Sequence, residues 1–352
     1  MRTHLLRTAT GLTTAVVASI VLASPAFACG GLVGENGTIQ LDRTTTLAAY
    51  HDGVEHYVTS FEFSGEGEQV GSIVPLPGIP TTVERGGDWT LQRLEREVRP
   101  PAPTAAKFST VAASASDAQV ILQTRIDALD ITILKGGGTE VGKWATDHGF
   151  LLTPDAPAVL DYYSQRSPIF MAARFDAAAA RARGQNAGDG TPIHLTIPLD
   201  RPWVPLRILA LGRDAASIVK ADVFLLTDQR PQLFSADPGV NVERSEPASN
   251  SLLADLRADK GMEWMPSGQW LTFLTIDTPA GNLNHDLAAS VNPARQPYAV
   301  DAGISTADVL NTLSIDGTNN ALALVLVTSG AAALLALIAG SQVTSRRRVI
   351  YQ

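Results

Sequence analysis

Two apolar segments bracket the chain and constrain the part that lies between them. The first lies within residues 1–28, where Arg2 and Arg7 precede an apolar stretch that ends in an Ala-x-Ala tripeptide at 26–28. A basic start, a short apolar core and small residues at positions −3 and −1 are typical of a secretory signal peptide. The core is too short to cross about 30 Å of hydrocarbon as a helix. We therefore expect cleavage after residue 28 and export of the chain from Cys29 onward.

The second apolar segment runs from Ala321 to Gly340 without a charge and is followed by Arg346, Arg347 and Arg348. Twenty helical residues cover about 30 Å, which is enough to span a membrane once. The positive-inside rule places the arginines in the cytoplasm. We expect a transmembrane helix over 321–343 and a cytoplasmic tail over 344–352. A cell-wall sorting signal is disfavoured, because residues 313–317 lack the proline and the threonine of Leu-Pro-x-Thr-Gly.

Cys29 is the only cysteine, so the chain cannot form an internal disulfide. It would be the first residue of the mature chain, which is also where bacterial lipoproteins carry a lipidated cysteine. Ala26 and Phe27 differ from the leucine and the small residue usual before such a cysteine. We expect an ordinary N-terminus and keep lipidation as the alternative.

The part between the two segments is acidic. All 35 acidic residues but only 22 of the 27 basic residues lie in residues 29–320, so this part carries a net charge of −13. An acidic surface repels phosphate backbones, which argues against nucleic acid as a partner.

The pattern of apolar residues predicts an α+β fold with β-rich mixed sheets, a few packed helices and the C-terminal transmembrane helix. The Asp52-Gly53 pair between two β-rich runs, 44–50 and 54–63, predicts a hairpin. Further strands are expected near 69–75, 120–134 with a break near 128, 169–175, 193–198, 204–211, 221–227 and 270–276, and helices near 88–98, 139–148, 155–166, 176–183 and 251–259.

Proline-rich segments suggest where the exported part divides. Prolines at 100–103 suggest a linker. We therefore expect a hairpin-rich subdomain with one helix over 29–104 and an α+β main domain over 105–281. The polar, proline-containing stretch after the main domain suggests a stalk over 282–320.

Three short motifs resemble one family. They are Cys-Gly-Gly at 29–31, Gly-Ser-Ile-Val-Pro-Leu-Pro at 71–77, and Ile-Pro-Leu at 197–199 with Val-Pro-Leu-Arg at 204–207. Together they resemble the actinobacterial family of exported, C-terminally anchored proteins known as domain of unknown function 2330. The resemblance covers nearly all of the exported part and the anchor. It implies the topology described above and no activity, catalytic residue or ligand.

A possible phosphate-binding loop lies at residues 137–143. With Gly137 as the first glycine, the segment to Lys143 has the Gly-x-x-x-x-Gly-Lys spacing. Trp144 stands where a serine or threonine would bind magnesium, so we interpret the segment as a glycine turn that leads into a helix. No nucleotide or other cofactor is expected.

His51, Glu55 and His56 resemble zinc-hydrolase motifs in composition only. Those motifs need both histidines on one turn of a helix, whereas Asp52-Gly53 here interrupts any helix. We expect polar residues around a hairpin tip and no metal site.

Other candidate residues are weaker. Acid–histidine neighbours occur at Asp147-His148 and at His285-Asp286, but neighbours in sequence do not build a catalytic triad. His194 alternates with Ile193, Leu195 and Ile197 and points away from their face. The remaining candidates are an acidic strand end that a hard cation would favour (Glu62, Glu66 and Glu68) and an aromatic platform (Trp264, Met265 and Trp270). We expect a solvated face and core packing, respectively.

No catalytic motif is found, so the catalytic residues stay unknown. We expect a protein of the cell membrane with one span, whose extracytoplasmic domain binds an envelope protein, a polymer or a small ligand. The alternative is an envelope hydrolase whose site is assembled from distant residues, with His148, His194 or His285 as base.

Overall fold

A computed structural model of the chain describes residues 31–34, 40–64, 69–99, 119–176, 178, 182 and 191–308. The expected signal peptide at 1–28, Cys29, the expected spanning segment at 321–343 and the tail at 344–352 lie outside this part. Among the helices that the structure describes, none is long and apolar enough to cross a membrane.

The predicted hairpin is confirmed and lies inside a large sheet. Strands β2 (Gln40–His51) and β3 (Val54–Ser64) pair antiparallel, with His51 opposite Val54. Asp52 and Gly53 form the turn with φ values of 47° and 78°. Glycine adopts positive φ without steric cost and aspartate tolerates it, which explains the turn at this place.

The hairpin belongs to a mixed seven-stranded sheet in the order β13-β14-β11-β2-β3-β9-β5. Within this sheet β2 and β11 run parallel, whereas the other neighbours run antiparallel. The strands other than the hairpin are β5 (Thr82–Arg85), β9 (Ile193–Pro198), β11 (Ile218–Thr227), β13 (Val240–Pro247) and β14 (Trp270–Pro279).

Two further sheets complete the β-structure. The five-stranded antiparallel sheet has the order β1-β4-β8-β7-β6, and the small sheet has the order β10-β15-β12. The first is built from β1 (Gly31–Gly34), β4 (Gln69–Leu76), β6 (Gln119–Ile126), β7 (Leu129–Lys135) and β8 (Ile169–Asp176). The second is built from β10 (Trp203–Val204), β12 (Gln232–Phe234) and β15 (Leu287–Ser290).

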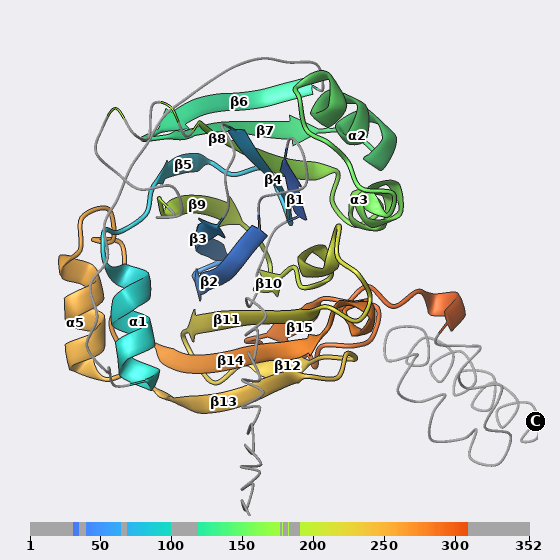
Figure 1. Cartoon of the computed structure of the whole chain (residues 1–352). Helices are drawn as coiled ribbons and strands as arrows, with labels where there is room; N and C mark the ends of the chain where they lie inside the picture. Colours follow the sequence, from blue (N-terminus) through green and yellow to red (C-terminus); the bar gives the residue numbers. More distant parts are fainter. Residues whose placement is uncertain are drawn as a thin grey trace, which may run out of the picture.

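Alternation along the strands of the seven-stranded sheet gives each of its faces a core. Tyr57 and Leu195 belong to the larger core, which also contains residues of the five-stranded sheet. Val58 and Phe224 lie on the opposite face and pack under α1 (Thr90–Val98) and α5 (Asn250–Ala258). Figure 1 shows these two helices side by side on one side of the molecule. The confirmed fold class is therefore α+β with β-rich mixed sheets.

A second pair of helices packs against one face of the five-stranded sheet. These are α2 (Gly138–Asp147) and α3 (Ala156–Ser164), which pack together (Figure 1). Phe150, just beyond α2, lies so close to this face that a Cβ atom at Gly71 would be 2.2 Å from its ring. The glycine at position 71 therefore lets the segment after α2 approach the sheet.

Three features differ from the sequence-based expectations. Residues 282–308, assigned above to a stalk, are part of the body: β15 pairs with β10 and β12, and Ala302 is fully buried. Strands from both sides of the expected boundary at 104/105 share the two large sheets. The predicted strand near 204–211 is instead the short β10 followed by a 3-10 helix, η2 (Arg207–Ala210).

Asp259 caps α1 from a distance. The carboxylate follows α5 and accepts hydrogen bonds from the backbone N–H groups of Asp88 (3.0 Å) and Trp89 (2.9 Å) and from the Thr90 hydroxyl (2.8 Å). It thereby holds the segment that enters α1, including the N-cap residue Trp89, against the C-terminal end of α5. The acceptor lies 171 positions from Asp88 in the sequence, so no local pattern predicts it.

We predict that Asp259→Ala lowers the free energy of unfolding by about 2 kcal/mol, because three donors at the start of α1, among them the buried Thr90 hydroxyl, lose their acceptor. Urea denaturation of wild type and variant measures the change. Asp255→Ala is the matched control. It removes a half-exposed partner of Arg93 on the same pair of helices and should cost less than about 1 kcal/mol. Equal losses in the two variants would contradict the capping role.

Candidate functional site

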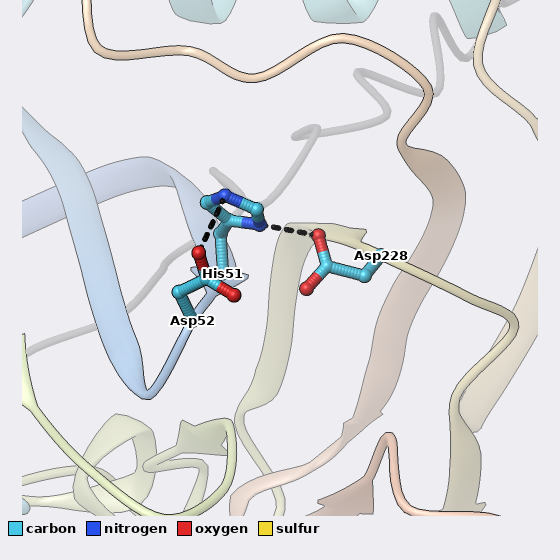
Figure 2. A group of neighbouring side chains, drawn as sticks. All are labelled: His51, Asp52 and Asp228. Atoms are coloured by element: carbon cyan, nitrogen blue, oxygen red, sulfur yellow. Dashed lines mark hydrogen bonds and ion pairs between the residues drawn. The ribbon is translucent and has the colours of Figure 1, made fainter.

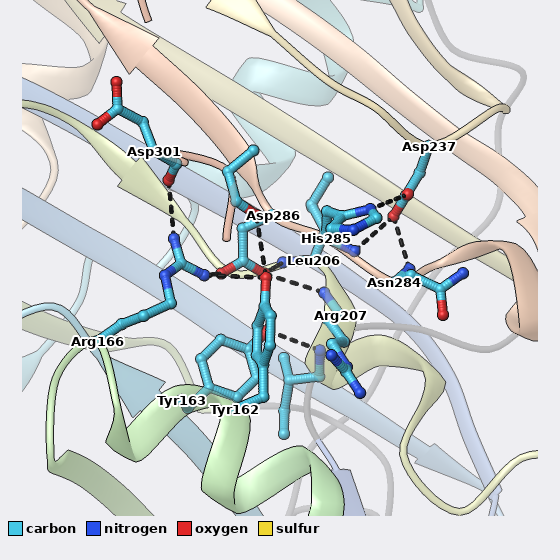
Figure 3. A network of polar contacts seen from close by, with 12 residues as sticks. Tyr162, Tyr163, Arg166, Leu206, Arg207, Asp237, Asn284, His285, Asp286 and Asp301 are labelled. Atoms are coloured by element: carbon cyan, nitrogen blue, oxygen red, sulfur yellow. Dashed lines mark hydrogen bonds and ion pairs between the residues drawn. The ribbon is translucent and has the colours of Figure 1, made fainter. Parts of the chain in front are cut away.

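A buried carboxylate organises the most extensive polar network among the described residues (Figure 3). Asp286 is 1% exposed. Its Oδ1 accepts hydrogen bonds from the Tyr163 hydroxyl (2.8 Å) and from the backbone N–H groups of Leu206 (2.9 Å) and Arg207 (3.1 Å). Its Oδ2 accepts from Arg166 Nη1 at 2.5 Å. The carboxylate thus joins α3 to the segment that begins η2.

Helix α3 and the turn after it supply one side of this network because of their spacing. Tyr162 and Arg166 are four residues apart and lie on one face, where Arg166 Nη1 also lies 3.1 Å from the Tyr162 hydroxyl. The Tyr163 hydroxyl also accepts from the backbone N–H of Ile208 at 2.9 Å. Burial raises the pKa of Asp286, while Arg166 and the three hydrogen bonds to Oδ1 act in the opposite direction.

A rim of cationic and aromatic side chains surrounds the buried carboxylate. We name it the cation–aromatic rim and define it as Tyr162, Arg166, Trp203 and Arg207, all half-buried. The Arg207 guanidinium lies 4.2 Å from the centre of the Tyr162 ring, and that of Arg166 lies 5.3 Å from Tyr162 and 5.9 Å from Trp203. Arg166 is paired with Asp286. The Arg207 guanidinium, in contrast, forms no ion pair with any carboxylate that the structure describes.

Beside the rim lies an aspartate–histidine pair (Figure 3). His285 Nδ1 is 2.7 Å from Asp237 Oδ1, and Asp237 Oδ2 accepts from the backbone N–H groups of Asn284 (2.7 Å) and His285 (2.8 Å). Although His285 and Asp286 are adjacent, their side chains enter different clusters. The Asp237 charge also contributes to raising the pKa of Tyr162, after burial and Asp286, so the pair and the rim share one region.

The chemistry available here is anion binding and base catalysis. A guanidinium stacked on a ring presents its N–H edge to a carboxylate or phosphate. A carboxylate that fixes one imidazole nitrogen leaves the other as a general base. Among the described residues, no hydroxyl or thiol hydrogen-bonds to His285, so the pair is two thirds of a triad at most.

Three residues that the sequence suggested separately meet at another place. The His56 ring stacks on Trp264 with centroids 3.7 Å apart, and His56 Nδ1 is 2.9 Å from His194 Nε2. Burial lowers the pKa of His56 to about 4 and that of His194 to about 3. Both imidazoles are therefore neutral at pH 7, and one donates a hydrogen bond to the other.

Glu55 precedes His56 in β3 and so lies on the opposite face of the sheet. Its side chain is fully buried, and Oε2 accepts a hydrogen bond from the backbone N–H of Trp203 at 2.7 Å. Burial raises the pKa of this carboxyl to about 8, although the Trp203 hydrogen bond opposes the shift. The two residues of the apparent zinc motif therefore face different environments. His51, the third, contacts Asp228 at the hairpin tip (Figure 2).

In the glycine-rich segment at 137–143, protein groups occupy the place where a phosphate would bind. Glu140 Oε2 accepts the backbone N–H of Gly137 at 2.5 Å, where a phosphate oxygen would bind. A Cβ atom at Gly138 would lie 2.2 Å from Asp161 of α3, so the turn is tightly packed. Within α2, Asp147 pairs with Lys143, and His148 donates through Nδ1 to the Trp144 carbonyl oxygen at 2.6 Å.

The predicted aromatic platform is divided among three environments. Trp264 stacks on His56, Met265 is 2% exposed in the core under α1 and α5, and the Trp270 ring N–H donates to Ser245 at 3.0 Å. The acidic strand end cannot be placed: Glu66 and Glu68 lie outside the described residues, and so does the side chain of Glu62 in β3.

Sequence reasoning named His285 as a candidate base but missed its partner Asp237 and the residues that make up the rim. Tyr162 and Arg166 had a usable signal, since an aromatic and an arginine four residues apart share a helix face. Asp237 and Arg207 had none, because each is brought to the site by loops far apart in the chain.

Comparison with known proteins identifies the family. The chain belongs to the family described as an uncharacterized protein conserved in bacteria, domain of unknown function 2330, which matches residues 23–287. This confirms the family that the short motifs resemble; the match ends at residue 287, before the expected anchor, and it shows neither actinobacterial origin nor export. No curated protein matches the sequence. Among solved structures, baculovirus P35 is similar with 11% identity and a TM-score of 0.37, over 72% of this chain and 98% of that one. A similarity at this level carries no functional argument.

We predict that stability is highest near pH 6.5 and falls by about 2 kcal/mol between pH 6.5 and 8. His56 and His194 bind protons more weakly when folded, so their contribution is lost as pH falls below 6.5. Glu55 binds its proton more strongly when folded, so its contribution is lost as pH rises from 4.5 to about 8. Above pH 6.5 only the Glu55 effect remains of the three.

Urea denaturation between pH 6 and 9 measures this slope. Glu55→Gln keeps the shape of the side chain without a titrating proton, so its alkaline decline should disappear. Glu263→Gln, at an exposed position, is the matched control and should keep the decline. A wild-type slope retained in Glu55→Gln would show that another group is responsible.

Proposed function

We propose that the chain, a member of a bacterial family without an assigned activity, is a membrane-anchored extracytoplasmic protein whose domain binds an anionic glycan of the envelope. The signal-like residues 1–28, the apolar run at 321–340 and the three arginines beyond it support the topology. The cation–aromatic rim supports the binding role.

The single observation that carries the binding role is the state of Arg207. Its guanidinium is half-buried, lies on the Tyr162 ring and has no acidic partner among the described residues, although the exported part is strongly acidic. In a chain with this charge, an arginine without a carboxylate is available to an external anion. Guanidinium groups bind carboxylates and phosphates through two parallel hydrogen bonds.

The aromatic members of the rim favour a sugar ligand over a simple anion. Trp203 and Tyr162 are half-buried aromatic side chains in contact with the arginines. Aromatic faces pack against the apolar faces of rings, while the arginine binds an acidic substituent. An acidic sugar polymer offers both groups within one repeating unit.

A hydrolase is the second candidate, and the Asp237–His285 pair favours it. Asp237 is 5% exposed and holds His285 Nδ1, while the His285 side chain is 28% exposed. An oriented and accessible imidazole is suited to activate water. In this alternative, the rim holds the polymer and His285 acts on it.

We predict that protease added to intact spheroplasts removes the bulk of the protein and leaves a small C-terminal fragment. An antibody against the tail at 344–352 detects that fragment. Lysis before protease treatment is the control and should allow the tail to be digested as well. Bulk protein that stays protected until lysis would contradict the topology.

We predict that Arg207→Ala weakens binding of a purified acidic envelope glycan by about 10- to 100-fold, because a charge-assisted interaction is lost. Isothermal titration of the full-length chain measures the affinity. Arg96→Ala removes an exposed arginine from α1 and should change nothing. The same glycan with its carboxyl groups reduced should bind as weakly to wild type as the acidic form binds to Arg207→Ala.

Two outcomes would contradict this assignment. Equal affinity of wild type for the acidic and the reduced glycan would show that binding does not depend on the negative charge of the glycan. Shortening of the glycan by wild type, stopped by His285→Gln, would instead establish the hydrolase.

A further inference from the structure

The tip of the β2–β3 hairpin brings three metal-ligating side chains together (Figure 2). His51 ends β2, Asp52 begins the turn, and Asp228 directly follows β11. Strands β2 and β11 are parallel neighbours, with Tyr50 opposite Thr227. The residues that follow the two strands therefore lie side by side at the same end of the strands. One ligand atom from each of the three side chains lies within 4.8 Å of the others.

The two carboxylates approach different nitrogens of the imidazole. Asp228 Oδ1 lies 2.6 Å from His51 Nδ1, and Asp52 Oδ2 lies 3.4 Å from His51 Nε2. Histidines that bind metals commonly donate their other ring N–H to a carboxylate, which fixes the tautomer. Two ligands of a tetrahedral zinc ion, each bound at about 2.0 to 2.2 Å, lie roughly 3.3 Å apart. The Nε2 atom and Asp52 Oδ2 already have this separation.

The buried side-chain amide of Gln269 contacts the cluster through Asp228. Gln269 is 3% exposed, and its Nε2 donates to Asp228 Oδ1 at 2.8 Å. Its Oε1 is buried and has no hydrogen-bond partner. Buried polar atoms without partners are rare and often indicate a water or ion at that place. The amide belongs to the same cluster through this hydrogen bond, and it holds the Asp228 carboxylate against Nδ1 of the His51 imidazole.

We propose that the hairpin tip binds a divalent transition metal of the zinc type. His51 Nε2 and Asp52 are the ligands, and Asp228 is a positioning residue that holds the imidazole. An imidazole nitrogen favours zinc, copper or nickel over magnesium and calcium, which prefer oxygen ligands alone. The Asp52 side chain is 86% exposed, so the remaining coordination positions are open to water or to an external ligand.

This site is independent of the proposed glycan binding. The rim comes from α3, from the turn after it and from residues around β10 and η2. The tip, in contrast, lies at the ends of β2 and β11, two interior strands of the seven-stranded sheet. Loss of metal binding would therefore leave Arg207-dependent glycan binding unchanged, and failure of one proposal can be told from failure of the other.

Titration of the full-length chain with Zn²⁺ by calorimetry, after removal of any polyhistidine tag, tests the proposal. We expect one equivalent to bind to wild type and no measurable binding to His51→Gln or Asp52→Asn. Asp228→Asn should weaken binding by about 10- to 100-fold, as loss of an orienting partner does. Visible absorption of the Co²⁺ form should report a nitrogen–oxygen ligand set that disappears in His51→Gln.

His285→Gln is the matched control, because His285 also pairs with an aspartate, at 2.7 Å, but belongs to no metal-ligating group among the described residues. It should bind Zn²⁺ as wild type does. Circular dichroism verifies that the exposed substitutions leave the fold intact. The proposal is overturned if wild type binds no Zn²⁺, if His51→Gln binds it unchanged, or if His285→Gln loses it.

Discussion

The body of the protein depends on the buried carboxylate of Asp286. An unpaired charge in the interior is strongly destabilising, so the four donors around Asp286 must be in place together. Those donors come from α3, from Arg166 just beyond its end, and from the start of η2. The next residue, Leu287, begins β15, so the same interaction fixes the small sheet and the segment up to Ala302. Arg166 extends the connection by donating to the Asp301 carbonyl oxygen at 2.8 Å.

The seven-stranded sheet separates an acid, Glu55, from a base, His56, and burial shifts their pKa values in opposite directions. Glu55 and His56 are neighbours in β3, yet one is buried in the core between the sheets and the other stacks under Trp264. Burial favours the neutral form of both, which raises the pKa of the acid and lowers that of the base. Glu55 and His56 are both neutral near pH 6.5, so at this pH neither residue places an uncompensated charge on its face of the sheet. Period-two alternation is sufficient to produce this arrangement.

Local signals in the sequence predicted much of the fold but little of the polar clusters. The Asp52-Gly53 turn and the break between β6 and β7 were predictable because turn chemistry acts over a few residues. Strand β13 was not, since its mostly exposed and polar residues at the edge of the sheet carry no apolar alternation. Residues 282–308 looked like a stalk because their buried strand is short and alanine-rich. His56 and His194 are 138 positions apart, and no local pattern reports that they meet.

The two aspartate–histidine pairs show how surroundings assign different chemistry to the same contact. Asp228 and Asp237 hold their histidines at 2.6 and 2.7 Å. Asp237 is nearly buried and fixed by two backbone N–H groups, and no second carboxylate that the structure describes faces the outer nitrogen of His285. At the hairpin tip, Asp52 stands opposite the outer nitrogen of His51, and a nitrogen and a carboxylate oxygen 3.4 Å apart form a pair of ligands. The position of one further carboxylate therefore distinguishes a base from a metal site.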